Sequence, residues 1–74
     1  MTNACVLIKT VPTKLEKILK EVKKFEEVTK AYIVFGRWDI VSFFDVADYH
    51  EIESITSEIN SLEGVRSTET LLES

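Results

Sequence analysis

Two kinds of side-chain periodicity alternate along this chain, and their order constrains the fold more than any other feature of the sequence. Four runs rich in β-branched and aliphatic residues predict strands at residues 4–11, 28–35, 40–46 and 65–72. Apolar residues also recur at the three-and-four spacing of a single helix face, at 13–25 and 49–62. The chain is therefore predicted to read strand, helix, strand, strand, helix, strand.

Each predicted helix begins with the sequence pattern of a capping box. Thr13 is followed three residues later by Glu16, and Asp48 is followed by Glu51. In this pattern the first side chain and the later carboxylate each accept a hydrogen bond from a backbone N–H that the helix leaves free. Gly64, two residues after the second apolar stripe, is a typical helix stop.

This order predicts an α+β fold of the ferredoxin-like kind, βαββαβ, in a single domain spanning residues 1–74. The gap at 36–39 has the length of a hairpin connection, so the two strands that flank it are expected to be antiparallel neighbours. Right-handed crossovers then place both helices on one face of a four-stranded antiparallel sheet. At 74 residues the chain is close to the smallest size that builds a core of its own.

Three of the four strands are apolar on both faces, although two helices can cover only one face of the sheet. Strict alternation predicts these opposed groups: Ala4, Val6 and Ile8 against Cys5, Leu7 and Val11; Val28, Tyr32 and Val34 against Ala31, Ile33 and Phe35; Ile40, Phe44 and Val46 against Val41 and Phe43. Each large apolar side chain left exposed forgoes roughly 1.5–3 kcal/mol. We therefore expect a homodimer, a dimeric α/β sandwich in which two open sheet faces pack together.

Composition argues against several classes of function. Thirteen acidic and nine basic residues give a net charge of −4, which opposes direct nucleic-acid binding. The longest apolar run, residues 4–8, is too short to span a membrane. One cysteine and one histidine cannot form a disulfide or a structural zinc site, and the sequence contains no catalytic signature. We expect a cytoplasmic protein that is not an enzyme and that uses no cofactor.

The connection at 36–39 is the most informative candidate site. A free amino acid needs an acceptor for its ammonium group, donors for its carboxylate and an apolar wall for its side chain. The connection offers a carboxylate, backbone N–H groups and a large aromatic side chain in one exposed place. The predicted ligand-binding residues are Gly36, Arg37, Trp38 and Asp39, with hydroxyl contacts from Thr68 and Thr70 on one face of the last strand. An ordinary turn would use the same residues, with a positive φ at the glycine and a local hydrogen bond from the aspartate.

The order and spacing of these short motifs resemble the effector domain of the Lrp/AsnC family of feast/famine regulators, called the RAM domain. The matching features are Gly36-x-x-Asp39, an acidic helix start near Asp48, Leu62-x-Gly64-Val65, and Thr68-x-Thr70. The resemblance covers nearly the whole chain, and it implies face-to-face dimers, larger rings such as octamers or decamers, and small effectors, commonly amino acids, bound between dimers. It also implies that Asp39 faces the amino group of the ligand, with Thr68 or Thr70 near by.

Family members usually carry a helix-turn-helix domain before this module, and the few residues before Ala4 are too short for one. The resemblance therefore predicts a stand-alone module that influences transcription indirectly, by mixed assembly with a full-length Lrp/AsnC regulator. Two alternatives stay open. One is an ACT-like regulatory domain, although Pro12-Thr13 stands where that family prefers a glycine-bearing loop. The other is a small dimeric ferredoxin-like α+β-barrel enzyme that uses Trp38 or His50.

Overall fold

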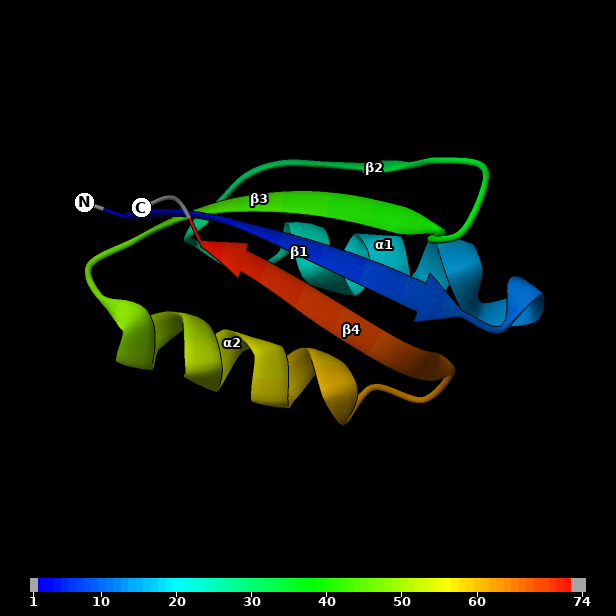
Figure 1. The fold of residues 1–74 in the computed structure, drawn as a ribbon. Coiled ribbons are helices and arrows are strands. Elements are labelled where there is room, and N and C mark those ends of the chain that lie inside the picture. Colours follow the sequence, from blue (N-terminus) through cyan, green and yellow to red (C-terminus); the bar gives the residue numbers. More distant parts are fainter. Residues whose placement is uncertain (1, 73–74) are drawn as a thin grey trace.

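The computed structural model describes residues 2–72 and has the predicted order of elements (Figure 1). These elements are β1 (Thr2–Thr10), a 3₁₀ turn η1 (Pro12–Lys14), α1 (Leu15–Lys23), β2 (Val28–Ile33), β3 (Ile40–Val46), α2 (Tyr49–Asn60) and β4 (Val65–Leu72). The strands lie in the order β2-β3-β1-β4, and every neighbouring pair is antiparallel. The predicted ferredoxin-like α+β fold is confirmed.

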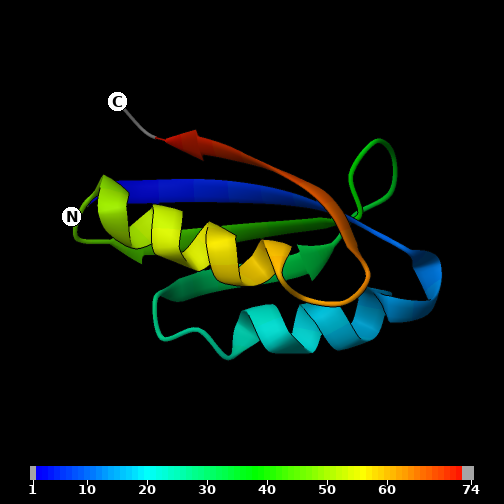
Figure 2. The same ribbon diagram turned by 90° about the horizontal axis from the view of Figure 1, so that it is seen from below.

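Both helices lie side by side along one face of the sheet (Figure 2). The sheet side chains that face them are almost fully buried, among them Val6, Ile8, Ile40 and Phe44. Phe25, just after α1, packs its ring edge-on against Phe44, with ring centroids 5.9 Å apart. This helix side of the sheet is the hydrophobic core, because α1 and α2 exclude water from it.

The first predicted capping box is wrong. Thr13 lies inside the 3₁₀ turn η1, α1 begins only at Leu15, and no described side chain caps it. Pro12 starts the tight turn, and the N–H of Val11 donates to the carbonyl of Gly64 at 2.8 Å. This contact with a distant segment fixes the path of the chain after β1, so the chain geometry that a cap at Thr13 requires does not form.

The second capping box is present. The Asp48 carboxylate accepts a hydrogen bond from the N–H of Glu51 at 3.1 Å. Glu51 reaches back to the N–H of Ala47 at 2.8 Å, one residue before the cap position. Acidic side chains therefore accept hydrogen bonds from backbone N–H groups on both sides of the cap residue of α2.

The second strand differs from its prediction in length and in register. It ends at Ile33, so Phe35 lies outside the sheet and is 99% exposed. An irregularity between Val28 and Lys30 shifts the pairing, so that Val28 lies opposite the buried Phe44. The extra residue places Val28 on the helix side, away from Tyr32, with which strict alternation had grouped it.

The connection between β2 and β3 lies at the opposite end of the sheet from the start of β1. Ala4 pairs with Leu72, so β1 begins where β4 ends, and Ile8 pairs with Ile40 at the other end (Figure 1). Residues 2 and 72, the first and last that the structure describes, therefore lie at the end of the sheet away from the predicted ligand-binding turn.

Candidate functional site

The connection after β2 is a closed turn. The N–H of Val34 donates to the carbonyl of Asp39 at 2.9 Å, which closes the loop at its base. Gly36 has a φ of +130°, and no described atom would lie within 4 Å of a Cβ at this position. Phe35 and Arg37 project into solvent, whereas Trp38 is half-buried. An aromatic, a guanidinium and exposed backbone N–H groups therefore gather on one small loop.

Asp39 ties this turn to the end of β1. Its N–H donates to the carbonyl of Ile8 at 3.0 Å, and its Oδ2 accepts from the N–H of Thr10 at 2.9 Å. The pairing of β1 with β3 ends at Ile8 opposite Ile40, so the carboxylate accepts the N–H of Thr10 just beyond the end of that ladder. Asp39 therefore has a structural hydrogen bond in addition to its predicted ligand role.

Lys9 is a neighbour of this turn that the sequence patterns did not single out. Its Nζ donates to the carbonyl of Arg37 at 3.2 Å and lies 4.0 Å from Asp39 Oδ2. The hydroxyl of Thr10 is buried, and it has no hydrogen-bond partner among the described residues. Lys9 and Arg37 are 28 residues apart along the chain, and Thr10 and Asp39 are 29 apart, so local sequence patterns could not reveal these contacts.

The two predicted threonines lie elsewhere in the monomer. Thr68 pairs with Ile8 and Thr70 with Val6, both of which face the helices, so the threonines also lie on the helix side of the sheet. The Thr68 hydroxyl donates to the side-chain oxygen of Asn60 in α2 at 3.2 Å. Within one chain, the structure brings the four turn residues together but does not bring the threonines to them.

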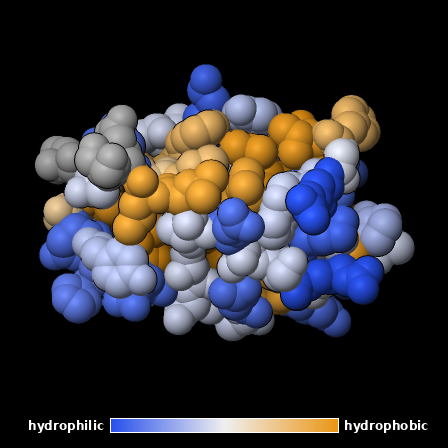
Figure 3. All heavy atoms as spheres, in the orientation of Figure 1, coloured by the Kyte–Doolittle hydropathy of each residue, from blue (hydrophilic) through white to orange (hydrophobic). Residues whose placement is uncertain are grey.

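The sheet face opposite the helices, here called the open face, carries a continuous apolar surface. Its central side chains are Cys5, Leu7, Val41, Phe43 and Leu71, and Leu71 is 49% exposed. Figure 3 shows apolar residues gathered over the strands, with hydrophilic residues below and beside them. The prediction that the sheet has a second apolar face is confirmed for the described residues.

Cys5 lies in the middle of the open face. It is half-buried, and this burial raises the pKa of its thiol above the ordinary value. A raised pKa keeps the thiol protonated near neutral pH, which is the opposite of what a nucleophilic cysteine requires.

The two residues considered as alternatives for an enzyme, Trp38 and His50, lie near opposite ends of β3. Trp38 precedes β3, whereas His50 lies in the first turn of α2, after β3 ends. A strand of that length separates them by about 20 Å. His50 is on the surface, with Nδ1 3.5 Å from Glu53 Oε1.

Two further features are absent within residues 2–72. No helix there is long and apolar enough to cross a membrane, and no three His, Cys, Asp or Glu side chains are arranged to hold a metal ion.

A family model described as the Lrp/AsnC ligand binding domain matches residues 3–73. The chain belongs to this family. Among curated proteins, the uncharacterized HTH-type transcriptional regulator PH0140 of Pyrococcus horikoshii is 34% identical over 68 residues, which are 90% of this chain and 43% of that protein. This Lrp/AsnC domain therefore spans less than half the length of that relative.

Solved structures share the fold. TTHA0845 from Thermus thermophilus is 32% identical, covers all of this chain and 94% of its own, and superposes with a TM-score of 0.96. AsnC of E. coli shares the fold, with a TM-score of 0.87 at 20% identity over 97% of this chain and 50% of its own. Membership of the Lrp/AsnC family confirms the resemblance and argues against the ACT-like and enzyme alternatives.

Proposed function

We propose that this chain is an oligomeric regulatory module that binds a small amino acid and influences transcription indirectly, through a full-length Lrp/AsnC regulator. The observation that carries the proposal is the combination of an apolar open face with a turn that carries Arg37, Trp38 and Asp39 and is hydrogen-bonded to the end of β1. Family membership supports the regulatory part, because the relative PH0140 is described as a transcriptional regulator. The net charge of −4 supports action through a protein partner rather than through phosphate contacts.

The proposed assembly begins with a homodimer. Tyr32 and Leu71 on the open face are 42% and 49% exposed, and more of the same surface is only half-buried. A second copy would cover this surface at a gain of roughly 25 cal/mol for each Å² of apolar area removed from water. Further contacts between dimers would then build a ring, such as an octamer or decamer.

The separation of the turn from the threonines supports a ligand site shared between chains. Asp39 borders the open face beside Lys9, whereas Thr68 and Thr70 lie on the helix side of another strand. One chain cannot offer all of them to a single small ligand. In the proposed ring, the turn of one dimer would meet β4 of the next dimer.

The chemistry of the turn suits a zwitterion. Asp39 Oδ2 is engaged with Thr10, so its Oδ1 would accept from the ammonium group of the ligand. The Arg37 guanidinium and the backbone N–H of Gly36 would hold the carboxylate. Phe35, which was predicted as a strand residue, would form an apolar wall together with Trp38.

Asp39→Asn tests the ligand site without removing its structural bond. The amide oxygen of asparagine can still accept from the N–H of Thr10, whereas the negative charge that would hold an ammonium group is lost. We expect calorimetric titration with the twenty amino acids to find at least one ligand of the wild type, and Asp39→Asn to weaken its binding at least tenfold.

Asp48→Asn is the matched control. It makes the same carboxylate-to-amide change at the cap of α2, at the other end of β3, and asparagine is an equally good cap. We expect it to bind as the wild type does. Binding of none of the twenty amino acids, or equal binding by Asp39→Asn and the wild type, would contradict the proposed site.

A further inference from the structure

Two rows of side chains cross the open face from one edge strand to the other. The pairing registers define the first row as Lys30, Phe43, Cys5 and Leu71, on β2, β3, β1 and β4 in turn. They define the second row as Tyr32, Val41, Leu7 and Glu69, in the same strand order. Each row thus has one charged residue, on an edge strand, and only uncharged residues on the two inner strands.

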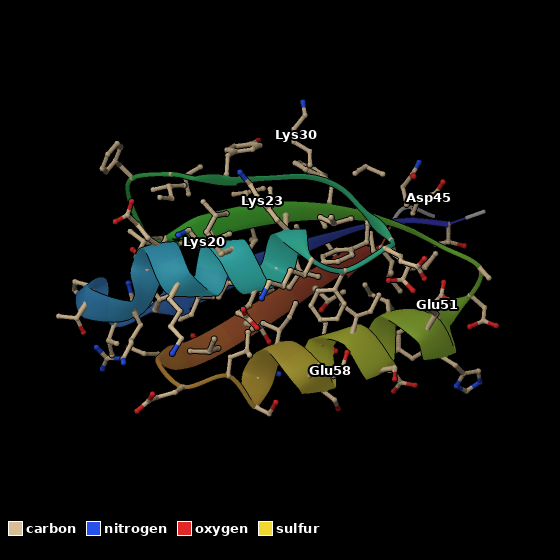
Figure 4. All side chains as sticks on the ribbon, turned by 180° about the vertical axis from the view of Figure 1, so that it is seen from behind. Lys20, Lys23, Lys30, Asp45, Glu51 and Glu58 are labelled. Carbon is tan, nitrogen blue, oxygen red and sulfur yellow. The ribbon has the colours of Figure 1, made fainter. Side chains whose placement is uncertain are left out.

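The two charges have opposite signs and lie at opposite edges. Lys30 is on the outer strand β2, Glu69 is on the outer strand β4, and both are exposed. No ion pair within the described residues engages either of them. Figure 4 shows Lys30 extending away from the β2 edge into solvent. Across one sheet they are three strand spacings and one row apart, about 16 Å, so they cannot pair within a chain.

The other charged groups on this face do not compete for these positions. Lys9 is held by its own chain, through the Arg37 carbonyl and Asp39. Asp45 lies on the inner strand β3, next to Asn3 and beyond both rows, where Figure 4 shows it near the end of the sheet. Lys30 and Glu69 are thus the charges that flank the apolar centre at its outer edges.

These positions discriminate between two ways of stacking a second copy on the open face. If the two-fold axis runs along the strands, β2 of one copy lies over β4 of the other. Lys30 then faces the partner's Leu71, one row or about 7 Å along the strand from the partner's Glu69, within reach of two long side chains. If the axis runs across the strands, each edge strand lies over the same strand of the other copy. Lys30 then approaches the partner's Lys30, and Glu69 approaches the partner's Glu69.

We infer that Lys30 of each copy pairs with Glu69 of the partner subunit, which sets the homodimer with β2 over β4. This inference rests on the dimer of the proposed function and adds the residues that fix its geometry. Two such pairs would frame the apolar centre by symmetry. Exposed ion pairs add little affinity, but opposed like charges are costly, so these residues select which domain is accepted as a partner.

Charge reversal tests the inference in solution. Lys30→Glu and Glu69→Lys each place two like-charged pairs in the dimer, so each should raise its dissociation constant roughly tenfold in low salt. The double exchange Lys30→Glu/Glu69→Lys restores opposite charges and should restore the wild-type constant. Lys20→Glu and Glu58→Lys are matched controls on the helix side, where Figure 4 shows both residues. Both should leave the dissociation constant of the dimer unchanged. Sedimentation equilibrium measures all five variants.

Zero-length cross-linking of the wild type gives a second readout. A carbodiimide joins a lysine amine to a carboxylate only when the two groups touch, so mass spectrometry should find Lys30 linked to Glu69 between isotopically labelled and unlabelled chains. A stable dimer with neither this link nor any response to Lys30→Glu would overturn the inference and leave the proposed function standing. A monomeric wild type would overturn the pairing and the proposed dimer together.

Discussion

Asp39, Gly36 and Gly64 show how single residues position the candidate site. Asp39 joins the turn to β1 through Oδ2, and Gly36 lets the turn close with a positive φ. Gly64 has a φ of +100°, and a Cβ there would lie 2.6 Å from the Cβ of Lys14. The two glycines therefore differ. Gly36 needs only the backbone freedom of glycine, whereas Gly64 also needs the space that a Cβ would fill beside Lys14.

The first prediction compares these two glycines. Gly36→Ala should lower the free energy of unfolding by about 1 kcal/mol, because alanine is strained at a positive φ. Gly64→Ala should cost about 3 kcal/mol or more, because the same strain is combined with a clash against Lys14. Urea denaturation at one fixed protein concentration measures both. Equal losses would mean that the contact between Gly64 and Lys14 relaxes freely.

At the scale of the secondary-structure elements, type and order could be predicted from the sequence, because strand and helix periodicities depend on neighbouring residues. The register of β2 could not be predicted, because the strand looks equally apolar with or without the irregular step between Val28 and Lys30. The cap at Thr13 failed because the distant Gly64 carbonyl binds Val11. The turn residues were found from local motifs, whereas their partners on β1 depend on long-range pairing.

The second prediction contrasts the two capping sequences. Asp48→Ala removes a bond that the structure contains, so it should lower the free energy of unfolding by about 1 kcal/mol. Thr13→Ala removes no capping bond and should change that free energy by less than about 0.5 kcal/mol. Chemical denaturation of both variants alongside the wild type is sufficient. A large loss for Thr13→Ala would show that the first capping box does form in solution.

For the whole molecule, the arrangement of the layers matters most. The helices complete a core on one side of the sheet, and the other side keeps a broad apolar surface with a cysteine at its centre. A second copy that covers this surface would also cover Cys5. The chemistry of a single thiol therefore reports on the assembly.

The third prediction follows from that position. Burial raises the pKa of the Cys5 thiol, and the thiolate is the form that reacts. Alkylation by iodoacetamide should therefore reach its half-maximal rate at a higher pH in the folded protein than in urea. The rate at a given pH should also rise on dilution, as dimers dissociate. A rate independent of protein concentration would contradict the burial of Cys5 between two copies.

The same shift has a consequence for stability. The thiol pKa of Cys5 is higher in the folded protein than in the unfolded chain. Its contribution to the free energy of unfolding is therefore complete below the unfolded-state pKa, and it is lost as the pH rises through the folded-state pKa. Cys5→Ser, whose side chain does not titrate in this range, should remove that alkaline loss. Denaturation curves at neutral and alkaline pH measure the difference.

The position of the first and last described residues has a practical consequence. Ala4 pairs with Leu72 at one end of the sheet, and the turn around Asp39 lies at the other end. A fluorescent protein or an affinity handle attached beyond the first or the last described residue would join the sheet at the end remote from the turn. Ligand binding and subunit exchange could thus be followed in living cells with tagged chains.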